Sequence, residues 1–248
     1  YAFQNNASFL SPDGRTATMA TPEAAEALQF MVDGYKIIGG YEEASKFQAT
    51  LKGGENDPFI VRQIAMKIDG DWIISGLARY APSLNFGVAP PPVPDDRFYK
   101  RGRFKDEKDT FITWVGGFSY AVPAGARNVE GAWRYIKFMS SVEAHAIETE
   151  AQRKWEQRRG RTLVPRLMAN IGRNEVNIQR FLPADQRLAD AYKMHVSLQP
   201  YARIRPATFV GQRLWDEHVR AMERACNLKV TPMESLKLSN AVVQKELD

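Results

Sequence analysis

The run from Phe59 to Trp72 carries the clearest pattern of apolar and polar positions in the chain. Gln63–Lys67 is short and mostly apolar, and Ile68 continues it, so the pattern predicts a strand buried on at least one face. Asp69-Gly70-Asp71 ends this strand, because glycine permits backbone angles that other residues resist. Trp72 is therefore expected at the carboxyl end of a strand, where open α/β sheets bind their ligands.

A helical period predicts most of the remaining elements. Thr21 suits an N-cap and Pro22 the first helical position, and apolar residues then recur at helical spacing as far as Gly39-Gly40. Further helices are expected at Tyr41–Leu51, Val129–Met139 and Glu143–Arg158, the last of them capped by Ser141. Helical segments then run to the end of the chain, broken near Pro165, Pro183, Pro200, Pro206 and Pro232.

Other segments read as strands, turns and one loop. Tyr1–Thr18 alternates enough for a hairpin with a turn at Pro12-Asp13-Gly14. Strands are expected at Leu84–Ala89, before a stiff run of prolines, and within Thr110–Val122. Ile73–Ala81 is expected to form a short helix or turn. Asp95–Asp109 is expected to be an exposed, charged loop.

Length and composition exclude several classes of protein. The 248 residues suffice for one large domain or two modest ones, and no apolar run is long enough to span a membrane. The single cysteine, Cys226, cannot form an internal disulfide and fits the apolar face of a helix. The three histidines lack ligand-spaced neighbours, so no metal site is expected, and no phosphate loop, nucleophile elbow or dinucleotide fingerprint occurs.

The basic charge has two interpretations. The net charge is +5 with a pI near 9.3, and most of the excess lies between Arg153 and Arg187. Glutamates interrupt this segment and its apolar residues recur at helical spacing, which favours a solvated helix face. Contact with an anionic partner or cell-surface polymer is the alternative.

Aromatic and acidic residues are the first candidate binding groups. Trp72 offers a flat apolar face with one N–H donor, on which the C–H face of a sugar can stack. Asp71 is placed to accept sugar hydroxyls, whereas Asp69 serves equally well to cap the turn. Paired acids also suggest a glycosidase, but such acids act across a scissile bond from different elements, and we reject this assignment.

A second group of candidates follows in two later segments. Gly116-Gly117, flanked by Trp114 and Ser119, would let a ligand approach the backbone, and a bulge in a packed strand is the alternative. The later segment provides four further candidates, Tyr201, Arg203, Arg205 and Trp215.

The two arginines raise the question of a charged ligand. Arg203 and Arg205 alternate, so one of them faces the ligand if the segment is strand-like. Arginine binds a carboxylate or phosphate through two parallel hydrogen bonds, which allows a uronide or sugar phosphate. A surface or bracing role for these arginines is the alternative.

Several phrases occur in the order that one known family has along its chain. They resemble the extracellular solute-binding proteins of carbohydrate ABC importers, the family that includes maltose-binding protein. In the stretch around Trp72, Arg62-Gln63 replaces the small residue that the family has before the strand. The matching positions are Tyr1-Ala2-Phe3 with Asp13-Gly14, Thr21–Phe30, Phe59, Ala65, Met66, Ile68, Gly70, Trp72, Phe86–Pro92, Trp114–Ser119, Ala132–Met139 and Thr231–Leu236.

The resemblance implies an α/β, periplasmic-binding-protein-like two-lobe fold that lacks its N-terminal part. We expect residues 1–92 to form the first part of the second lobe, and residues 93–162 to form the hinge crossover and a segment returning to the first lobe. Residues 163–248, mainly helical, would complete the second lobe. The chain is accordingly expected to be the C-terminal part of a longer protein.

The resemblance also implies a function. The chain would bind a carbohydrate outside the cytoplasmic membrane, in a periplasmic or lipid-anchored form, and deliver it to the transmembrane subunits of an ABC permease. No catalytic step, cofactor, metal or nucleic acid is implied, and the full-length protein is expected to be a monomer. Two alternatives stay open, a carbohydrate-active enzyme and a polyanion-binding module that uses the basic Arg153–Arg187 face.

Overall fold

A computed structural model describes residues 1–51 and 53–248 of the chain. They form two compact units: unit 1 comprises Tyr1–Leu51, Pro91–Gly116 and Tyr201–Asp248, and unit 2 comprises Lys52–Pro90 and Gly117–Pro200. The described residues are mainly helical, with one two-stranded sheet. The expected boundaries at 92 and 162 concern the lobes of a larger fold, so they stay predictions.

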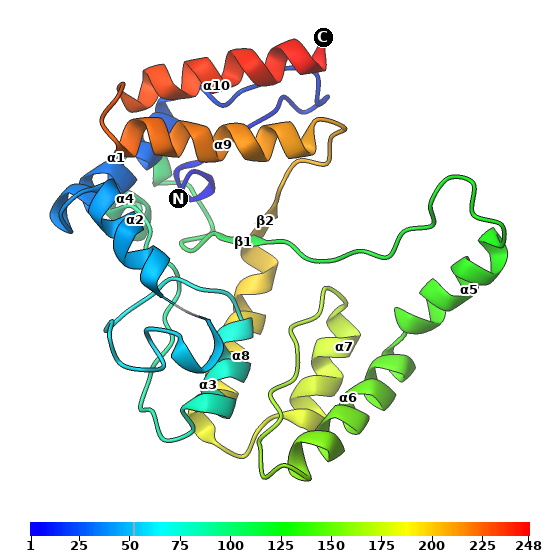
Figure 1. Ribbon diagram of the computed structural model, residues 1–248. Helices are drawn as coiled ribbons and strands as arrows, with labels where there is room; N and C mark the ends of the chain where they lie inside the picture. Colours follow the sequence, from blue (N-terminus) through cyan, green and yellow to red (C-terminus); the bar gives the residue numbers. More distant parts are fainter. Residues whose placement is uncertain (52) are drawn as a thin grey trace. The chain divides into compact units, whose positions relative to one another are not determined.

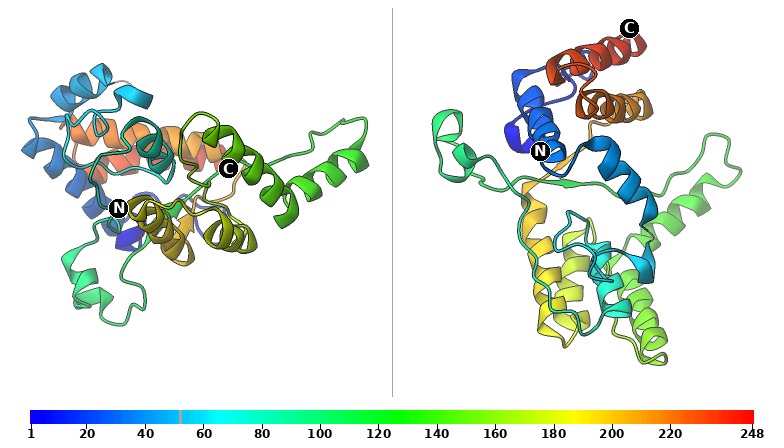
Figure 2. Two further views of the ribbon diagram at one scale, coloured as in Figure 1. Left: turned by 90° about the horizontal axis from the view of Figure 1, so that it is seen from below. Right: turned by 60° about the vertical axis from the view of Figure 1, so that its left-hand side comes forward.

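Unit 1 is built around three long helices that pack on one another (Figures 1 and 2). These are α1 (Pro22–Ile37), α9 (Gly211–Cys226) and α10 (Pro232–Leu247). The shorter elements of unit 1 are the 3-10 turns η1 (Phe3–Asn5) and η3 (Gly102–Phe104), the helices α2 (Tyr41–Thr50) and α4 (Asp95–Phe98), and the strands β1 (Thr113–Val115) and β2 (Ala202–Ile204).

The long helices begin where their capping residues predict. The Thr21 side chain accepts a hydrogen bond from the Ala24 N–H at 3.2 Å, which satisfies one of the free donors of the first turn of α1. At the start of α10, Thr231 and Glu234 form a reciprocal capping box. Seven buried residues of α1, α9 and α10 share one apolar core, which confirms the packing role of Cys226: Ala24, Leu28, Val32, Ala221, Ala225, Cys226 and Leu236. Leu214 and Val243 belong to a second core cluster.

The hairpin expected over Tyr1–Thr18 is present only in its second half. Leu10 and Ala17 form an antiparallel bridge, and the Ser11 N–H donates to the Thr16 carbonyl at 2.8 Å. Gly14 has a φ of 71°, a conformation that glycine adopts without strain. The first half forms the turn η1 instead of a strand.

The prediction of an exposed loop over Asp95–Asp109 is confirmed in part: most of its residues are exposed, but the segment contains α4 and η3 and buries Arg97 and Phe104. Arg97 is 0% exposed, and its guanidinium donates to the Gln4 carbonyl at 2.6 Å, to the Asp109 carbonyl at 2.8 Å and to the Asn6 side chain. Burial lowers the pKa of Arg97, Glu107 opposes this shift, and the positive charge of Arg203 adds to it. A charged residue thus ties three segments of unit 1 together.

Unit 2 is helical throughout its described secondary structure. Its elements are η2 (Gly54–Asn56), α3 (Trp72–Tyr80), α5 (Val129–Met139), α6 (Val142–Gln157), α7 (Ile171–Val176), the π-helical turn η4 (Asn177–Phe181) and α8 (Gln186–Leu198). The 3-10 turn η5 (Gln199–Tyr201) precedes β2 and spans the point where unit 2 ends, at Pro200, and unit 1 resumes, at Tyr201. The apolar core of unit 2 lies between α3 and α8. It includes Ile74, Ala78, Val164, Leu188, Ala191 and Tyr192.

A buried polar network supplements that core. His145 Nε2 lies 2.8 Å from the Asn177 side-chain oxygen, and the Asn177 amide donates to the Tyr192 hydroxyl at 2.8 Å. Burial raises the pKa of Tyr192 to about 12, so the hydroxyl stays protonated and bonded. The network holds α6, η4 and α8 in a fixed arrangement.

The strands expected at Gln63–Ile68 and Leu84–Ala89 do not form, and these two predictions are wrong. Met66 and Ile68 are exposed in irregular backbone, and the sheet that the described residues form consists of β1 and β2 alone. A strand needs hydrogen-bonded neighbours to be stable, and neither segment has one here. By contrast, the short helix expected within Ile73–Ala81 is confirmed as α3.

The basic segment is largely occupied with structural contacts. Arg173 donates to the carbonyls of Ser141 and Met139, and Arg187 pairs with Asp185 at 2.6 Å and donates to the Pro82 carbonyl. Such bonds fix loops to helices within unit 2. They favour a bracing role for these two arginines over contact with a polyanion.

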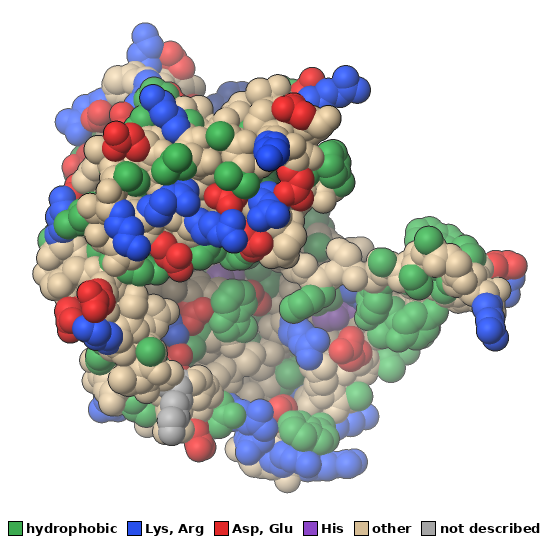
Figure 3. Space-filling view, turned by 45° about the horizontal axis from the view of Figure 1, so that its top comes forward, with side chains coloured by type: hydrophobic (Ala, Val, Ile, Leu, Met, Phe, Trp, Pro, Cys, Tyr) green, Lys and Arg blue, Asp and Glu red, His purple; other side chains and the backbone are tan. Residues whose placement is uncertain are grey.

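Helix α5 confirms the prediction for Val129–Met139 but buries no residue. Asn128 caps it by accepting from the Gly131 N–H at 2.8 Å. Its exposed hydrophobic residues include Trp133, Tyr135 and Phe138. Figure 3 shows hydrophobic side chains gathered on the segment that carries α5. A helix this apolar normally packs against a partner. No helix among the described residues is long and apolar enough to cross a membrane.

We predict that His218 makes the stability of the chain sensitive to acid. Its Nδ1–H donates to the Leu214 carbonyl at 2.6 Å, and its buried Nε2 has no partner among the described residues. Burial lowers the pKa of His218 below its ordinary 6.5, so the unfolded chain binds the proton more readily. Stability present above pH 6.5 is therefore lost as the pH falls toward the folded-state pKa.

Urea denaturation between pH 7.5 and 5 measures this effect. His218→Gln removes the titrating group and is expected to flatten the profile. His195→Gln is the matched control, because the His195 ring also contacts the carbonyl four residues earlier, at 2.8 Å. An unchanged pH profile in His218→Gln would contradict the prediction.

Candidate functional site

A short parallel sheet places the residues of the candidate site. Strand β1 pairs with β2 in a register that sets Trp114 opposite Arg203. Paired residues of neighbouring strands project from the same face of a sheet, so both side chains lie on one side. The strand predicted within Thr110–Val122 is confirmed only over Thr113–Val115, in the first half of that region. Arg203 lies in β2, so the condition that its segment be strand-like is met for this residue.

Arg205 follows β2 and lies between two indoles. Its guanidinium carbon is 5.4 Å from the centroid of the Trp114 ring and 4.7 Å from that of the Trp215 ring. Trp215 lies on α9, where its neighbour Leu214 enters the core and Trp215 itself is 46% exposed. Trp114 is also 46% exposed. Each pairing of the cation with a ring is a favourable contact at these distances.

A glycine beside Trp114 allows its ring to lie close to the backbone. A Cβ atom on Gly116 would come within 2.9 Å of the Trp114 ring, which is too close for an undisturbed contact. Gly117 has open space around its Cα. Both glycines follow β1 and do not interrupt it, so a bulge inside a packed strand is not their role. Ser119 is exposed beyond them.

Trp72 is held in a similar way within unit 2. A Cβ atom on Gly70 would lie 2.1 Å from the Trp72 ring, so the indole folds back over the glycine backbone. The sequence argument expected Gly70 to adopt an unusual backbone angle, but its φ is not positive. Trp72 begins α3 and does not end a strand, yet it is 65% exposed and keeps a free face.

The two acidic residues beside Trp72 both have partners in the fold. Asp71 accepts from the Leu167 N–H at 3.3 Å. Asp69 accepts from the Gly70 N–H at 2.8 Å and pairs with Lys67 at 2.6 Å. Burial opposes the charge of Lys67, but Asp57 and Asp69 together raise its pKa. These contacts give both carboxylates a structural role, which does not support a catalytic pair.

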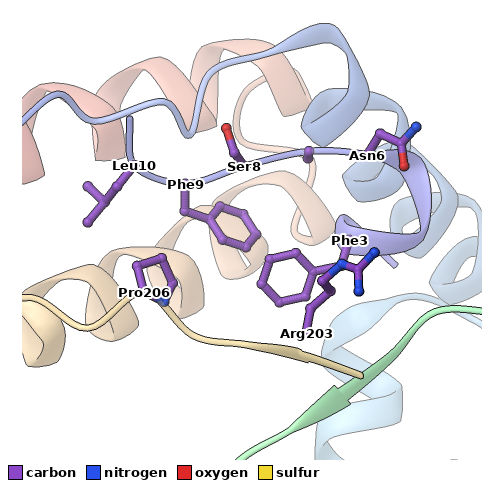
Figure 4. A pocket seen from close by; sticks show the side chains of 8 residues that line it. Phe3, Asn6, Ser8, Phe9, Leu10, Arg203 and Pro206 are labelled. Carbon is purple, nitrogen blue, oxygen red and sulfur yellow. The ribbon is translucent and has the colours of Figure 1, made fainter. Parts of the chain in front are cut away.

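The sequence did not indicate a hollow that lies beside β2. It has a volume of about 330 Å³ and is lined by eight residues of unit 1, among them Phe3, Phe9, Arg203 and Pro206 (Figure 4). The Phe3 and Phe9 rings meet edge to face with centroids 5.2 Å apart. Phe3 enters the site through the turn η1, which the predicted hairpin did not anticipate.

The candidate residues divide between the two units. Unit 1 holds Trp114, Gly116, Tyr201, Arg203, Arg205 and Trp215, whereas unit 2 holds Asp71, Trp72, Gly117 and Ser119. Tyr201 is exposed at the start of the β2 segment. No three His, Cys, Asp or Glu side chains gather to hold a metal ion in the part of the chain that the structure describes. The candidate residues of unit 1 can bind a ligand through aromatic stacking, by Trp114 and Trp215, and through positive charge, on Arg203 and Arg205.

Solved structures with sugars bound resemble the chain along almost its whole length. CpMnBP1 with mannobiose matches with a TM-score of 0.65 and 19% identity, over 98% of this chain and 54% of its own. An ABC substrate-binding protein from Listeria monocytogenes, in complex with cycloalternan, matches with a TM-score of 0.60 and 20% identity, over 99% and 55%. The chain shares their fold.

A third solved structure covers similar shares of the two chains. A cyclic α-maltosyl-1,6-maltose binding protein from Arthrobacter globiformis matches with a TM-score of 0.56 and 20% identity, over 99% of this chain and 54% of its own. The chain thus spans about half the length of these proteins. No protein-family model and no curated protein matches the sequence.

We predict that Gly116→Ala displaces the Trp114 ring. The added methyl group occupies the space of the indole, which must rotate away from Arg205. Because the ring is on the surface, the free energy of unfolding should change by less than about 1 kcal/mol. The indole N–H resonance of Trp114, assigned with Trp114→Phe, reports the movement. Gly117→Ala adds a methyl group in open space and is expected to leave the resonance in place. An unmoved resonance in Gly116→Ala contradicts the geometry.

Proposed function

We propose that the chain binds a carbohydrate outside the cytoplasmic membrane and delivers it to an ABC transporter permease. The observation that carries this proposal is the match of 98–99% of the chain to proteins whose structures contain bound sugars. One of these proteins is described as an ABC substrate-binding protein. The proposal of sugar binding starts from this similarity of fold, and the side chains of this chain must account for the binding itself.

The exposed tryptophans support a sugar ligand. Trp72, Trp114 and Trp215 each keep about half of their surface or more accessible to solvent. Two of them, Trp72 and Trp114, lie against a glycine two residues away, which restricts each ring, and Arg205 also lies over the Trp114 ring. Fixed aromatic faces suit the C–H surfaces of sugar rings, because little conformational freedom is lost on binding.

We further infer that the chain provides the second lobe, and a segment of the first, in an α/β two-lobe fold. Its match to about half of each similar protein is consistent with this assignment. Met66, Ile68 and most of the large apolar side chains of α5 are exposed to solvent. Strands and helices from the rest of such a fold would cover these side chains.

The proposed cycle needs binding and closure only. Pro90-Pro91-Pro92 joins the two units and offers a stiff hinge about which lobes could close on a sugar. The closed form would present itself to the permease, with no catalytic step and no cofactor. The full-length protein would act as a monomer.

We predict that the complete natural chain binds a sugar and that Trp72 contributes to affinity. A thermal-shift screen against neutral sugars, uronides and sugar phosphates should reveal a saturable ligand. Calorimetry on Trp72→Ala should then show an affinity at least about tenfold lower, because a stacking surface is lost.

Trp155→Ala is the matched control for this experiment. Trp155 is also partly exposed in unit 2, but the Arg159 guanidinium covers its ring at 3.7 Å. Its loss should leave the affinity unchanged. A full screen without any stabilising sugar would overturn the proposed function, and unchanged binding in Trp72→Ala would remove that residue from the site.

We also predict that Trp133 of α5 is buried by the rest of the two-lobe fold. Trp133→Gln should lower the free energy of unfolding of the complete chain by about 2 kcal/mol, because apolar area returns to water. In the 248-residue chain, where Trp133 is exposed, the change should stay within about 0.5 kcal/mol. Arg134→Gln, on the exposed pair with Glu130, is the control in both chains. Equal small effects in the two chains would rule out the packing.

A further inference from the structure

The guanidinium of Arg205 lies over two indole rings and donates no hydrogen bond to a described residue. Its carbon lies 4.7 and 5.4 Å from the centroids of the Trp215 and Trp114 rings, which contact it from two elements of the same unit. A guanidinium on an aromatic ring keeps its N–H donors in its own plane, where they can reach a ligand. The rings also restrict the arginine, so that less freedom is lost when a ligand binds.

Neither Arg203 nor Arg205 has an acidic partner in the part of the chain that the structure describes. No carboxylate lies within 4 Å of their side-chain nitrogens, and neither side chain donates a hydrogen bond to a described residue. Both arginines are exposed, Arg203 within β2 and Arg205 directly after it. This is a concentration of uncompensated positive charge.

A third cation, Arg97, lies close by. Its pKa is lowered chiefly by burial, Glu107 at 3.8 Å opposes this shift, and Arg203 adds to it. Arg203 also borders the hollow lined by Phe3 and Phe9, where Figure 4 shows its guanidinium beside the Phe3 ring. A volume of about 330 Å³ is at the small end of ligand pockets, sufficient for about one sugar ring.

These features select for a particular ligand chemistry. A neutral sugar gains from the indoles but leaves the arginine donors to water. An acidic sugar uses both, because its ring stacks while its anionic group accepts two parallel N–H bonds from a guanidinium. Charge-assisted bonds of this kind are about twice as strong as neutral ones.

We propose that the face formed by Trp114, Arg203, Arg205 and Trp215 binds the anionic group of an acidic oligosaccharide. This inference rests on the proposed sugar-binding function and specifies its substrate class. Arg205, whose guanidinium lies over the two indoles, donates to the anion from the edge of the guanidinium, and Arg203 binds a second charge or the sugar that enters the neighbouring hollow.

Calorimetry on the complete natural chain tests the proposal. The probes are oligosaccharides of galacturonate, mannuronate and glucuronate, their methyl esters, sulfated oligosaccharides, sugar phosphates, and neutral manno- and malto-oligosaccharides of matched length. An acidic probe should bind at least roughly tenfold more tightly than its neutral counterpart. The acidic arms distinguish a carboxylate from a sulfate or phosphate as the anion.

Arg205→Gln should abolish this preference, so that the best acidic probe and its neutral counterpart bind with similar affinity. Arg101→Gln is the matched control: Arg101 also stacks on a ring, that of Tyr99, at 5.0 Å, but it is already paired with Asp96 at 3.3 Å. It should keep the preference.

The outcomes separate this inference from the proposed function. Tight binding of a neutral sugar with no gain from charge overturns the acidic specificity and leaves sugar binding intact. An acidic preference that survives in Arg205→Gln overturns the role of that residue. Absence of binding to every probe overturns the proposed function, and this inference with it.

Discussion

The parallel pairing of β1 with β2 is the contact on which the candidate site depends, because it joins segments far apart in the sequence. Three residues on each strand are too few to be stable alone. The pair is supported by polar contacts from η1 and α4: the Gln4 side chain donates to the carbonyl of Ile112, at 3.1 Å, and Arg97 to that of Asp109. The positions of Trp114 and Arg205 therefore depend on buried hydrogen bonds elsewhere in unit 1.

The elements that could be predicted from the sequence are those stabilised within a few residues. Helix α1 begins at a Thr-Pro pair and α10 at a capping box, and both occur where these local signals place them. Strands depend on distant partners, so the apolar run at Gln63–Ile68 was an insufficient signal. The burial of Arg97 could not be predicted from the sequence either, because the carbonyls that accept its hydrogen bonds lie 93 residues before it and 12 residues after it.

The candidate site was predictable in its membership but not in its arrangement. Aromatic and arginine residues at Trp114, Arg203, Arg205 and Trp215 could be picked out as suitable for a sugar. Their spacing in the sequence did not reveal that a guanidinium would lie between two indoles. The contribution of Phe3 was missed, because its ring reaches the hollow through a 3-10 turn where alternation suggested a strand.

Arg97 and Arg205 illustrate how burial decides what an arginine does. Both lie against aromatic rings, Arg97 over Phe104 at 4.6 Å and Arg205 between two indoles. The donors of Arg97 are used by carbonyl and amide oxygens in the interior, so this residue can only stabilise the fold. Arg205 also lies over aromatic rings, but on the surface, and it donates no hydrogen bond to a described residue. A charge held in place without a protein partner gains most from an anion that approaches from outside.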